Sequence, residues 1–474
     1  MNARPFLLNG EWIVSHETIV VRNPFDGSDL GMVSIANAEH IETAVAGCAS
    51  AFQKTRRQSA RERSELLQNV RFEIEKRAEE FVDLLVREAG KPVDLARIEV
   101  SRAQQTFGFA AAEALRQRGE PIAIDASAPG KGHTGFVHRV PLGVILGITP
   151  FNFPLNLVAH KIAPALATGN TILVKPSLRT PLICFLLGEA LVEAGILSGQ
   201  VNILTFHHDL LTPLFTDPRI KMTSFTGSAA VGWGIKAQAV KQRVCLELGG
   251  NAALIIHSDA DWEKRLPSVA AACFGYAGQS CISVQRIFVQ ESIYETFKQS
   301  LVWFAQEKVK AGDPAQSGVL VGPMIDPSAL EKVTSWIAAA QGAGAKCCMP
   351  PKVNGRCLHP VVLENVPSTS EIACEEAFAP IVVLEPYEEF EDAIVKVNAS
   401  RYGLQAGVFT SDLELAEKAY QEIDAGAVLI NQTPTFRVEN MPYGGVKDSG
   451  FGREGVGYTM EEMTEMKTLI VNYL

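Results

Sequence analysis

The chain of 474 residues lacks a long uncharged apolar run, and it lacks an excess of basic residues. A membrane-spanning helix needs about 20 consecutive apolar residues, so we expect no membrane span. Lysine and arginine number 43 against 53 acidic residues, which gives a formal net charge of −10. Nucleic acids and anionic membranes require a basic surface, so we expect neither as a partner.

The sequence also lacks a secretion signal and a disulfide framework. Residues 1–10 have neither the apolar core nor the cleavage site of a signal peptide, so the cytoplasm is the expected location. Nine cysteines, an odd number, are scattered along the chain. Cys347, Cys348, Cys357 and His359 cluster, but without the C-x2-C pairs of a structural zinc site. We therefore expect no metal.

Composition and apolar periodicity indicate a large globular protein of about three domains. Hydrophobic residues make up 47% of the chain and charged residues 20%. Residues 62–89 have apolar side chains at intervals of three and four, which predicts one long amphipathic helix ended by Gly90.

From residue 142 onward, short apolar runs alternate with helical stretches. Strands are predicted at 144–148, 171–174, 201–204 and 222–225. Helices are predicted between them at 155–168, 181–194 and 229–240. This alternation predicts an α/β fold with a doubly wound parallel sheet, which binds ligands at the carboxyl ends of its strands.

A second α/β pattern follows the first. Strands are predicted at 252–256 and 286–290, and a helix at 293–308. The segment 311–322 is rich in glycine, proline and aspartate, which predicts a connecting loop. We find no internal repeat.

Cys281 lies in Ala277-Gly278-Gln279-Ser280-Cys281, where small neighbours would let a substrate approach the thiol. Taken alone, this cysteine is more simply interpreted as a buried structural residue. Glu247, beside the glycine pair 249–250, could serve as a general base or as an ordinary capping carboxylate. Asn152 follows the strand 144–148, so its amide could donate to an oxyanion or merely lie in a rigid turn.

The motif Phe225-Thr226-Gly227-Ser228 also follows a strand and begins a helix. Free amides and the helix dipole at such a start are suited to a pyrophosphate. The literal G-x-G-x-x-G match at 450–455 is followed by no βαβ unit, so we reject it as a dinucleotide site.

Together, the order and spacing of these motifs resemble the aldehyde dehydrogenase superfamily. The resemblance rests on residues 150–154, 175–177, 225–228, 247–250, 278–281, 375–380 and 442–450, and it extends over nearly the whole chain. It is nearest to the branch of lactaldehyde, succinate-semialdehyde, phosphonoacetaldehyde and non-phosphorylating glyceraldehyde-3-phosphate dehydrogenases.

The resemblance implies a catalytic role for three residues. Cys281 would attack the aldehyde to form a thiohemiacetal, with the oxyanion held by the Asn152 amide and the Cys281 backbone N–H. Hydride transfer to the cofactor would leave a thioester. Glu247 would activate the water that releases the carboxylic acid.

The resemblance also implies a cofactor site for NAD or NADP. The residues implied are Phe151, Lys175, Ser177, Gly227, Ser228, Glu376 and Phe378. Many NAD-preferring relatives carry a glutamate three positions after the lysine, where this chain has Leu178. Without that carboxylate nothing repels a 2′-phosphate, so we expect NADP to be accepted, with the preference left open.

For the substrate, the resemblance implies that His160, Arg102 and Arg437 line the aldehyde tunnel. These side chains suit a carboxylate, phosphonate or phosphate better than an apolar aldehyde. We therefore expect a small polar or anionic aldehyde. The alternative for each cation is a structural ion pair or cap.

The implied architecture has three parts. Residues 1–118 and 142–249 would form a Rossmann-like cofactor domain, and 250–449 an α/β catalytic domain. Residues 119–141 and 450–474 would form a small β oligomerisation element, so a homodimer or homotetramer is expected.

Three rival functions remain open at this point. A cofactor-independent cysteine esterase would use Cys281 and Glu247, but it would not need the cofactor motifs. A non-catalytic protein on this fold would not need Cys281, Glu247 and Asn152 together. A CoA-acylating relative would transfer the acyl group to CoA in place of water.

Overall fold

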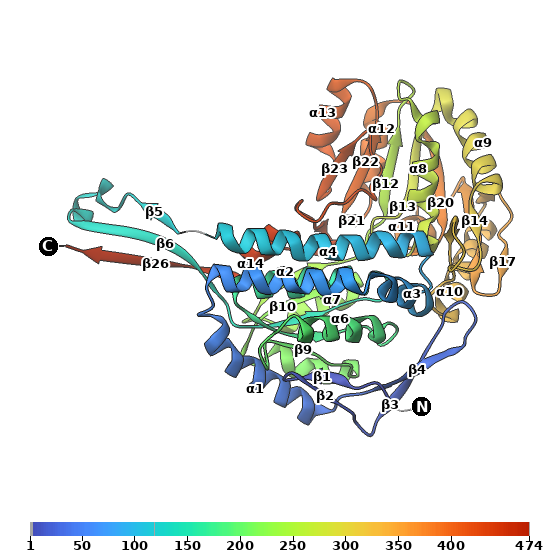
Figure 1. The fold of residues 1–474 in the computed structure, drawn as a ribbon. Helices are drawn as coiled ribbons and strands as arrows, with labels where there is room; N and C mark the ends of the chain where they lie inside the picture. Colours follow the sequence, from blue (N-terminus) through green and yellow to red (C-terminus); the bar gives the residue numbers. More distant parts are fainter. Residues whose placement is uncertain (1–2, 118, 474) are drawn as a thin grey trace.

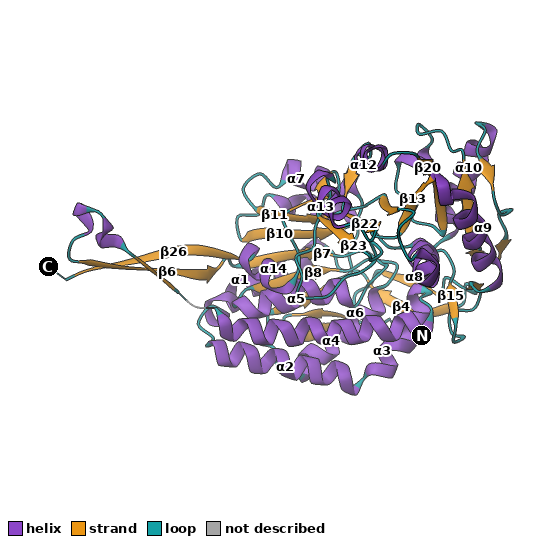
Figure 2. Ribbon diagram, turned by 90° about the horizontal axis from the view of Figure 1, so that it is seen from above, coloured by secondary structure: helices purple, strands orange, loops and turns teal. Residues whose placement is uncertain are grey.

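The computed structural model describes residues 3–117 and 119–473. Two sheets covered by helices form the body, and a long hairpin projects from it (Figures 1 and 2). Met1, Asn2, Arg118 and Leu474, at the limits of the expected parts, lie outside the described residues.

The first sheet has eight strands, and its five central strands are parallel. In spatial order the strands are β2 (Glu11–Ile13), β1 (Phe6–Leu8), β9 (Val201–Ile203), β8 (Thr171–Lys175), β7 (Val144–Ile148), β10 (Ile220–Thr226), β11 (Arg243–Glu247) and β25 (Gly450–Phe451). The helices packed around this sheet include α1 (Ala38–Thr55), α4 (Val93–Arg116), α5 (Asn156–Thr168), α6 (Pro181–Glu193) and α7 (Ala229–Gln238). The expected doubly wound α/β sheet is confirmed, and its strands and helices lie within two residues of the predicted bounds.

The prediction of a single helix at 62–89 is wrong. The chain forms α2 (Ala60–Lys76) and α3 (Ala78–Ala89), with a break at Arg77, whose φ of −107° and ψ of 18° are not helical. The Arg77 guanidinium reaches Glu189 of α6 at 3.4 Å. Both halves bury their apolar face in the same core, which is why the sequence pattern continues across the break. Gly90 ends α3 in the left-handed conformation, as predicted.

The second sheet has seven strands. In spatial order they are β16 (Lys346–Cys347), β19 (Val361–Glu364), β20 (Ile381–Tyr387), β13 (Val284–Gln290), β12 (Ala252–Ile256), β22 (Gln405–Phe409) and β23 (Ala427–Ile430). Its helices include α8 (Trp262–Phe274), α9 (Glu291–Glu307), α10 (Pro327–Gly342), α12 (Phe390–Asn398) and α13 (Leu413–Glu422). The predicted loop 311–322 contains a short strand, β15 (Val319–Val321), paired with β14 (Lys310–Ala311).

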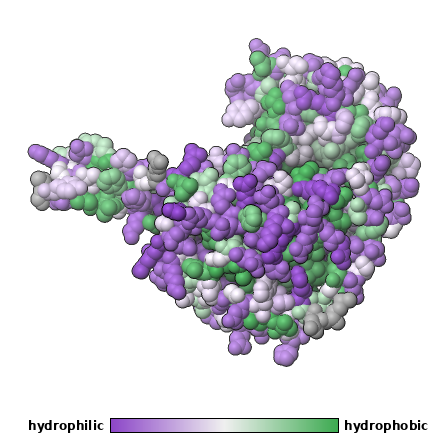
Figure 3. Space-filling model, viewed as in Figure 1, coloured by the Kyte–Doolittle hydropathy of each residue, from purple (hydrophilic) through white to green (hydrophobic). Residues whose placement is uncertain are grey.

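The projecting arm consists of β5 (Glu120–Ile122), β6 (His133–Pro141) and β26 (Thr464–Asn472). β26 pairs antiparallel with β6 along its whole length, and the arm extends away from the body (Figure 1). Apolar side chains lie exposed on it (Figure 3). Among them, Met466 is 65% exposed and Ile470 54%.

The boundary expected at residue 450 differs from the structure. β25 pairs with β11 of the first sheet, and α14 (Val456–Glu462) packs on α5. Val456, Met460 and Met463 are buried in the core of the first sheet, which holds this segment on the body. The C-terminal part of the arm therefore begins at Thr464.

None of the described helices is long and apolar enough to cross a bilayer. Within the same residues, no group of three or more histidine, cysteine or acidic side chains is arranged to hold a metal ion. Of the cysteines in the cluster at 347–359, Cys357 is buried and lies 3.7 Å from the Gly312 carbonyl oxygen.

Candidate active site

A cavity of about 320 Å³ lies where the carboxyl ends of strands in the first sheet face loops of the second half of the chain. Most of the expected site residues line it, although they come from segments far apart in sequence. They are Arg102, Phe151, Asn152, Gly227, Ser228, Glu247, Cys281, Glu376, Phe378 and Arg437. Three expected residues, His160, Lys175 and Ser177, do not line this cavity.

Cys281 is positioned by a tight loop between α8 and β13. Tyr276, Ala277 and Gly278 have φ angles of 52°, 54° and 65°, so three successive residues are left-handed. Such backbone costs energy at non-glycine positions and persists only where its surroundings hold it. The Tyr276 hydroxyl donates to the Ala89 carbonyl at 2.9 Å. A Cβ on Gly278 would lie 2.1 Å from the Ala379 carbonyl oxygen, so glycine is required there.

The Cys281 thiol is partly buried beside two groups that favour its ionised form. Burial raises its pKa to about 11, and the Tyr443 hydroxyl and the Arg437 charge act in the opposite direction. The Tyr443 oxygen lies 2.9 Å from the Cys281 Sγ atom. The Arg437 guanidinium stacks 3.8 Å from the centre of the Tyr443 ring. Tyr443 lies in the segment 442–450, on which the family resemblance partly rests, but the sequence predicts no role for it.

Glu247 ends β11, and its side chain is 3% exposed. Neither of its carboxyl oxygens has a hydrogen-bond partner among the described residues. Burial, and then the charge of Glu454, raise the pKa of Glu247 well above its usual range. Burial of this kind favours the protonated carboxyl group, which must be ionised before it can act as a base.

Asn152 lies in the turn between β7 and α5, at the carboxyl end of its strand. Its side-chain nitrogen donates to the Gln279 carbonyl at 3.0 Å, across to the cysteine loop. An amide nitrogen carries two hydrogens, so one remains for a ligand. The amide oxygen is buried and has no hydrogen-bond partner in the described part of the chain.

The expected pyrophosphate motif occupies the start of α7, as the sequence predicts. Ser228 is the N-cap residue of this helix, and its hydroxyl makes no capping hydrogen bond, so it is available to a ligand. A Cβ on Gly227 would lie 2.5 Å from the Phe225 ring, which explains the glycine. The free amides of the first helical turn face toward a site where an anion is favoured.

Glu376 lies against the glycine pair that follows Glu247. One of its oxygens accepts a hydrogen bond from the Gly250 N–H at 3.1 Å, and burial raises its pKa to about 7. The other would lie 2.5 Å from a Cβ on Gly249. Phe378 meets the edge of Phe151 with ring centres 5.9 Å apart. This half of the cavity is thus an apolar slot with one carboxylate.

Lys175 ends β8 outside this cavity. The residue is 1% exposed, and its ammonium group makes no hydrogen bond or ion pair with the described residues, facing only the Phe206 ring at 5.5 Å. Burial lowers its pKa to about 8. A nearly buried cation without an anionic partner suits the phosphate or hydroxyl groups of a bound molecule. The Ser177 hydroxyl accepts from the Arg179 backbone N–H, and the Arg179 guanidinium pairs with Asp326 at 2.8 Å.

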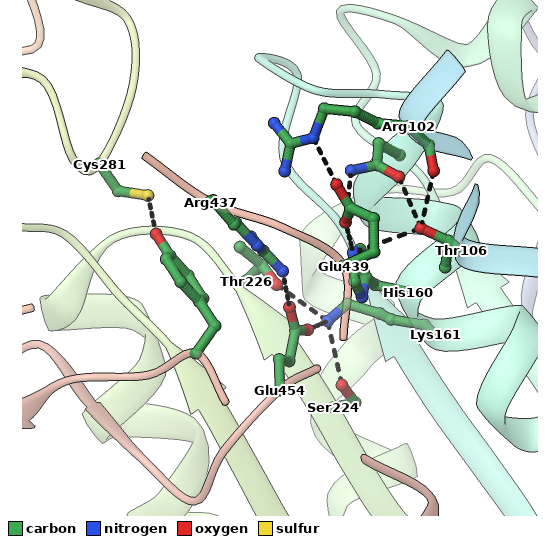
Figure 4. A network of polar contacts seen from close by, with 12 residues as sticks. Arg102, Thr106, His160, Lys161, Ser224, Thr226, Cys281, Arg437, Glu439 and Glu454 are labelled. Atoms are coloured by element: carbon green, nitrogen blue, oxygen red, sulfur yellow. Dashed lines mark hydrogen bonds and ion pairs between the residues drawn. The ribbon is translucent and has the colours of Figure 1, made fainter. Parts of the chain in front are cut away.

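A buried ion pair behind the cavity was not expected from the sequence. The Lys161 ammonium donates to Glu454 at 2.8 Å, and also to Ser224 and Thr226 (Figure 4). Arg437 lies 3.6 Å from the other Glu454 oxygen. Lys161 is a lone lysine in α5, where every side chain is buried, and that contrast is the sequence signal for it.

His160 lies one layer behind the cavity wall rather than in it, contrary to the expectation of direct substrate contact. The side chain is 0% exposed, and its Nε2 atom contacts Glu439. Burial lowers its pKa, so the ring is neutral. Arg102 does line the cavity, and its Nε atom donates to the same Glu439 carboxylate. The ring therefore does not face the cavity, and the Glu439 carboxylate lies between it and Arg102.

The chain is similar to known proteins over nearly its whole length. A sequence model of the aldehyde dehydrogenase family matches residues 12–469. The 3-sulfolactaldehyde dehydrogenase of Priestia aryabhattai is 39% identical over 466 residues, which cover 98% of this chain and 97% of that protein.

Two solved structures share the fold throughout. Aldehyde dehydrogenase 21 from Physcomitrella patens, in complex with the reaction product succinate, has a TM-score of 0.97 and 37% identity, covering 100% of this chain and 99% of its own. NADP-dependent glyceraldehyde-3-phosphate dehydrogenase from Bacillus halodurans, complexed with NADP, has a TM-score of 0.96 and 33% identity, covering both chains fully. The chain therefore belongs to the aldehyde dehydrogenase family.

Proposed function

We propose that this enzyme oxidises a small anionic aldehyde to its carboxylic acid with NAD or NADP, through a thioester on Cys281. The observation that carries the proposal is that the cavity holds both the Cys281 thiol and the Arg437 guanidinium. Arg437 is almost fully buried; its Nη2 atom lies 3.6 Å from Glu454 Oε2, and neither Nε nor Nη2 has a hydrogen-bond partner among the described residues. A buried guanidinium with unused donors suits an anionic ligand.

The charges around the cavity support an anionic substrate. Lys161, Arg437 and Arg102 face the carboxylates of Glu454 and Glu439. Burial also disfavours the charged form of Glu247. Among the described residues, three cations thus face two carboxylates in this layer. The similar proteins named above act on a sulfonated aldehyde, hold the dicarboxylate succinate, or act on a phosphorylated aldehyde.

In the first step, the Cys281 thiolate attacks the aldehyde carbon and forms a thiohemiacetal. The Tyr443 hydroxyl and the Arg437 charge stabilise the thiolate that burial disfavours. The second amide hydrogen of Asn152 and the Cys281 backbone N–H donate to the oxyanion. One such donor typically contributes roughly 3–4 kcal/mol to the stability of the transition state.

NAD or NADP, when bound, supplies the hydride acceptor. The described residues fit such a molecule. The start of α7 with Ser228 would hold the pyrophosphate, and Glu376 would hold the ribose beside the slot of Phe151 and Phe378. Glu247 then takes a proton from the water that cleaves the thioester on Cys281. Its carboxyl oxygens have no hydrogen-bond partner among the residues that the structure describes, so both are available to that water.

We propose that NADP is accepted as well as NAD. Position 178 is a leucine, so no carboxylate at this position would repel a bound 2′-phosphate. Lys175 has no anionic partner within the described chain and Ser177 adds a hydroxyl, so both are available to that phosphate. Arg179 is drawn toward Asp326, which leaves Lys175 as the main cation.

We further propose that the arm forms the contact between subunits of a homodimer or homotetramer. β26 is the edge strand of the arm sheet and exposes Met466, Leu469 and Ile470. An apolar edge strand favours pairing with another chain. The cytoplasmic location expected from the sequence stays a prediction.

The test of the proposed function is the formation of reduced nicotinamide by the purified enzyme. The substrates are succinate semialdehyde, phosphonoacetaldehyde, lactaldehyde and propanal, each with NAD and with NADP, without CoA. The anionic aldehydes are expected to give a kcat/KM at least about tenfold above that of propanal, the ratio that corresponds to 1.4 kcal/mol. Equal values for charged and uncharged aldehydes would rule out the anionic pocket, and a rate that requires CoA would rule out water as the acyl acceptor.

A further inference from the structure

The Glu439 carboxylate lies behind the cavity wall and is shared by three residues. Its side chain is 1% exposed. One oxygen accepts from Arg102 Nε, and the other from the His160 ring (Figure 4). The second oxygen also accepts from Asn156 Nδ2 at 3.3 Å. Because the three donors come from α4 and α5, the carboxylate joins two helices at the edge of the site.

This arrangement determines how Arg102 is presented to the cavity. Arg102 is anchored through Nε, and neither of its terminal nitrogens has a hydrogen-bond partner among the described residues. The side chain lines the cavity, with its guanidinium 5.9 Å from the Phe153 ring. A free arginine side chain has many rotamers, so an anchor at Nε reduces the entropy lost when the terminal fork binds an anion.

His160 and Asn156 hold Glu439 in place. The His160 Nε2 atom faces the Glu439 carboxylate, which can only accept, so the single hydrogen of the neutral ring lies on Nε2 and donates. The Nδ1 atom has no partner among the described residues. The Thr106 hydroxyl donates to the Asn156 amide oxygen at 3.0 Å, which turns the Asn156 NH₂ group toward Glu439. Hydrogen bonds thus run from α4 and α5 through Glu439 to the guanidinium in the cavity wall.

We propose that Glu439 is a positioning residue that sets substrate specificity by holding Arg102 as a second anion-binding group beside Arg437. This inference rests on the proposed anionic substrate. Glu439 could instead act by its charge alone, and a carboxylate near the site would then repel the substrate. The two roles predict opposite effects on KM when the charge is removed.

The first test is Glu439→Gln, assayed with succinate semialdehyde and with propanal. The glutamine oxygen can still accept from His160 and Asn156, whereas its NH₂ group faces Arg102 Nε with a donor and releases the guanidinium. KM for succinate semialdehyde should rise at least about tenfold more than KM for propanal, as expected for one lost charged hydrogen bond. The change in kcat should be similar for both substrates. A fall in KM for succinate semialdehyde would overturn the proposal.

A double-mutant cycle shows whether Glu439 acts through Arg102. Adding Glu439→Gln to Arg102→Ala should change KM for succinate semialdehyde by less than about twofold. Full additivity of the two changes would mean that Glu439 acts by another route. If Glu439→Gln does not fold, His160→Leu releases the other carboxylate oxygen and should shift KM in the same selective way. Equal shifts for both substrates would contradict the proposal.

The same assays separate this inference from the proposed function. The wild-type preference for succinate semialdehyde over propanal tests the anionic pocket, and it is measured before any variant. If the wild type shows that preference but the two changes in the cycle are additive, only the positioning role of Glu439 is rejected.

Discussion

The phenol oxygen of Tyr443 lies 2.9 Å from the Cys281 sulfur, on the ring against which the Arg437 guanidinium stacks. One tyrosine therefore contacts both the proposed nucleophile and the proposed anion-binding group. Burial raises the pKa of the Cys281 thiol to about 11, and the Tyr443 hydrogen bond opposes that rise. Because the thiolate is the reactive form, the reactivity of this cysteine depends on the tyrosine hydroxyl.

The first prediction concerns Tyr443→Phe. Loss of the hydroxyl raises the pKa of Cys281 further, so the thiolate fraction falls at every pH below about 11. Alkylation of the Cys281 peptide by iodoacetamide should be about 3- to 10-fold slower at pH 8, the effect of one hydrogen bond to a charged group. The pH profile should shift to higher pH. Cys281→Ser provides the control peptide, and faster alkylation in Tyr443→Phe would contradict the account.

The second prediction concerns Arg437→Ala. The variant loses a buried guanidinium whose Nε and Nη2 atoms have no hydrogen-bond partner among the described residues. KM for succinate semialdehyde should rise by roughly 10- to 100-fold relative to the change for propanal, as expected when a charged hydrogen bond is lost. Arg97→Ala, on the exposed face of α4, is the matched control and should alter neither ratio. Equal effects of Arg437→Ala on both aldehydes would remove Arg437 from substrate recognition.

The third prediction concerns the cofactor and Lys175. Its ammonium has no ionic partner among the described residues, and burial lowers its pKa to about 8. As pH rises through that value the cation is lost, so kcat/KM for NADP should fall relative to kcat/KM for NAD. Lys175→Met should remove this pH dependence and lower kcat/KM for NADP more than for NAD. A selectivity between the two cofactors that is constant from pH 6 to 10 would contradict the assignment.

Much of the fold could be predicted because buried parallel strands are continuous apolar runs. β7 and β12 have the bounds that the sequence predicts. The break at Arg77 could not be predicted, because the apolar face continues on both sides of it. The sequence predicts that the C-terminal part of the arm begins at residue 450, whereas the structure places its start at Thr464. The packing of 450–463 on the first sheet is a tertiary contact, which the local sequence pattern does not show.

In the site, motifs that follow strands led to the residues that line the cavity. Cys281, Glu247 and Asn152 lie where three distant segments meet, and their order along the chain was sufficient to find them. The polar layer behind the cavity was not found. Glu439 is 279 positions from His160, and Glu454 is 293 positions from Lys161. Buried pairs of this kind leave one signal in the sequence, a charged residue inside an otherwise buried helix such as α5.

The central claim is that a thioester forms on Cys281 and is released by Glu247. Glu247→Gln keeps the size of this buried side chain but removes the base, and general bases of this kind typically accelerate a step by roughly 10²- to 10⁴-fold. The acyl-enzyme should then accumulate. The steady-state rate of the wild type should rise with pH as Glu247 ionises from its raised pKa, and the variant should lack that rise.

The most direct measurement is mass spectrometry of the Glu247→Gln enzyme, quenched in acid after mixing with succinate semialdehyde and NADP. The account predicts one acyl group on the peptide that contains Cys281, present only when the cofactor is added and absent in Cys281→Ser. Release of succinate without any adduct on Cys281, or an adduct of the same mass formed without the cofactor, would contradict it.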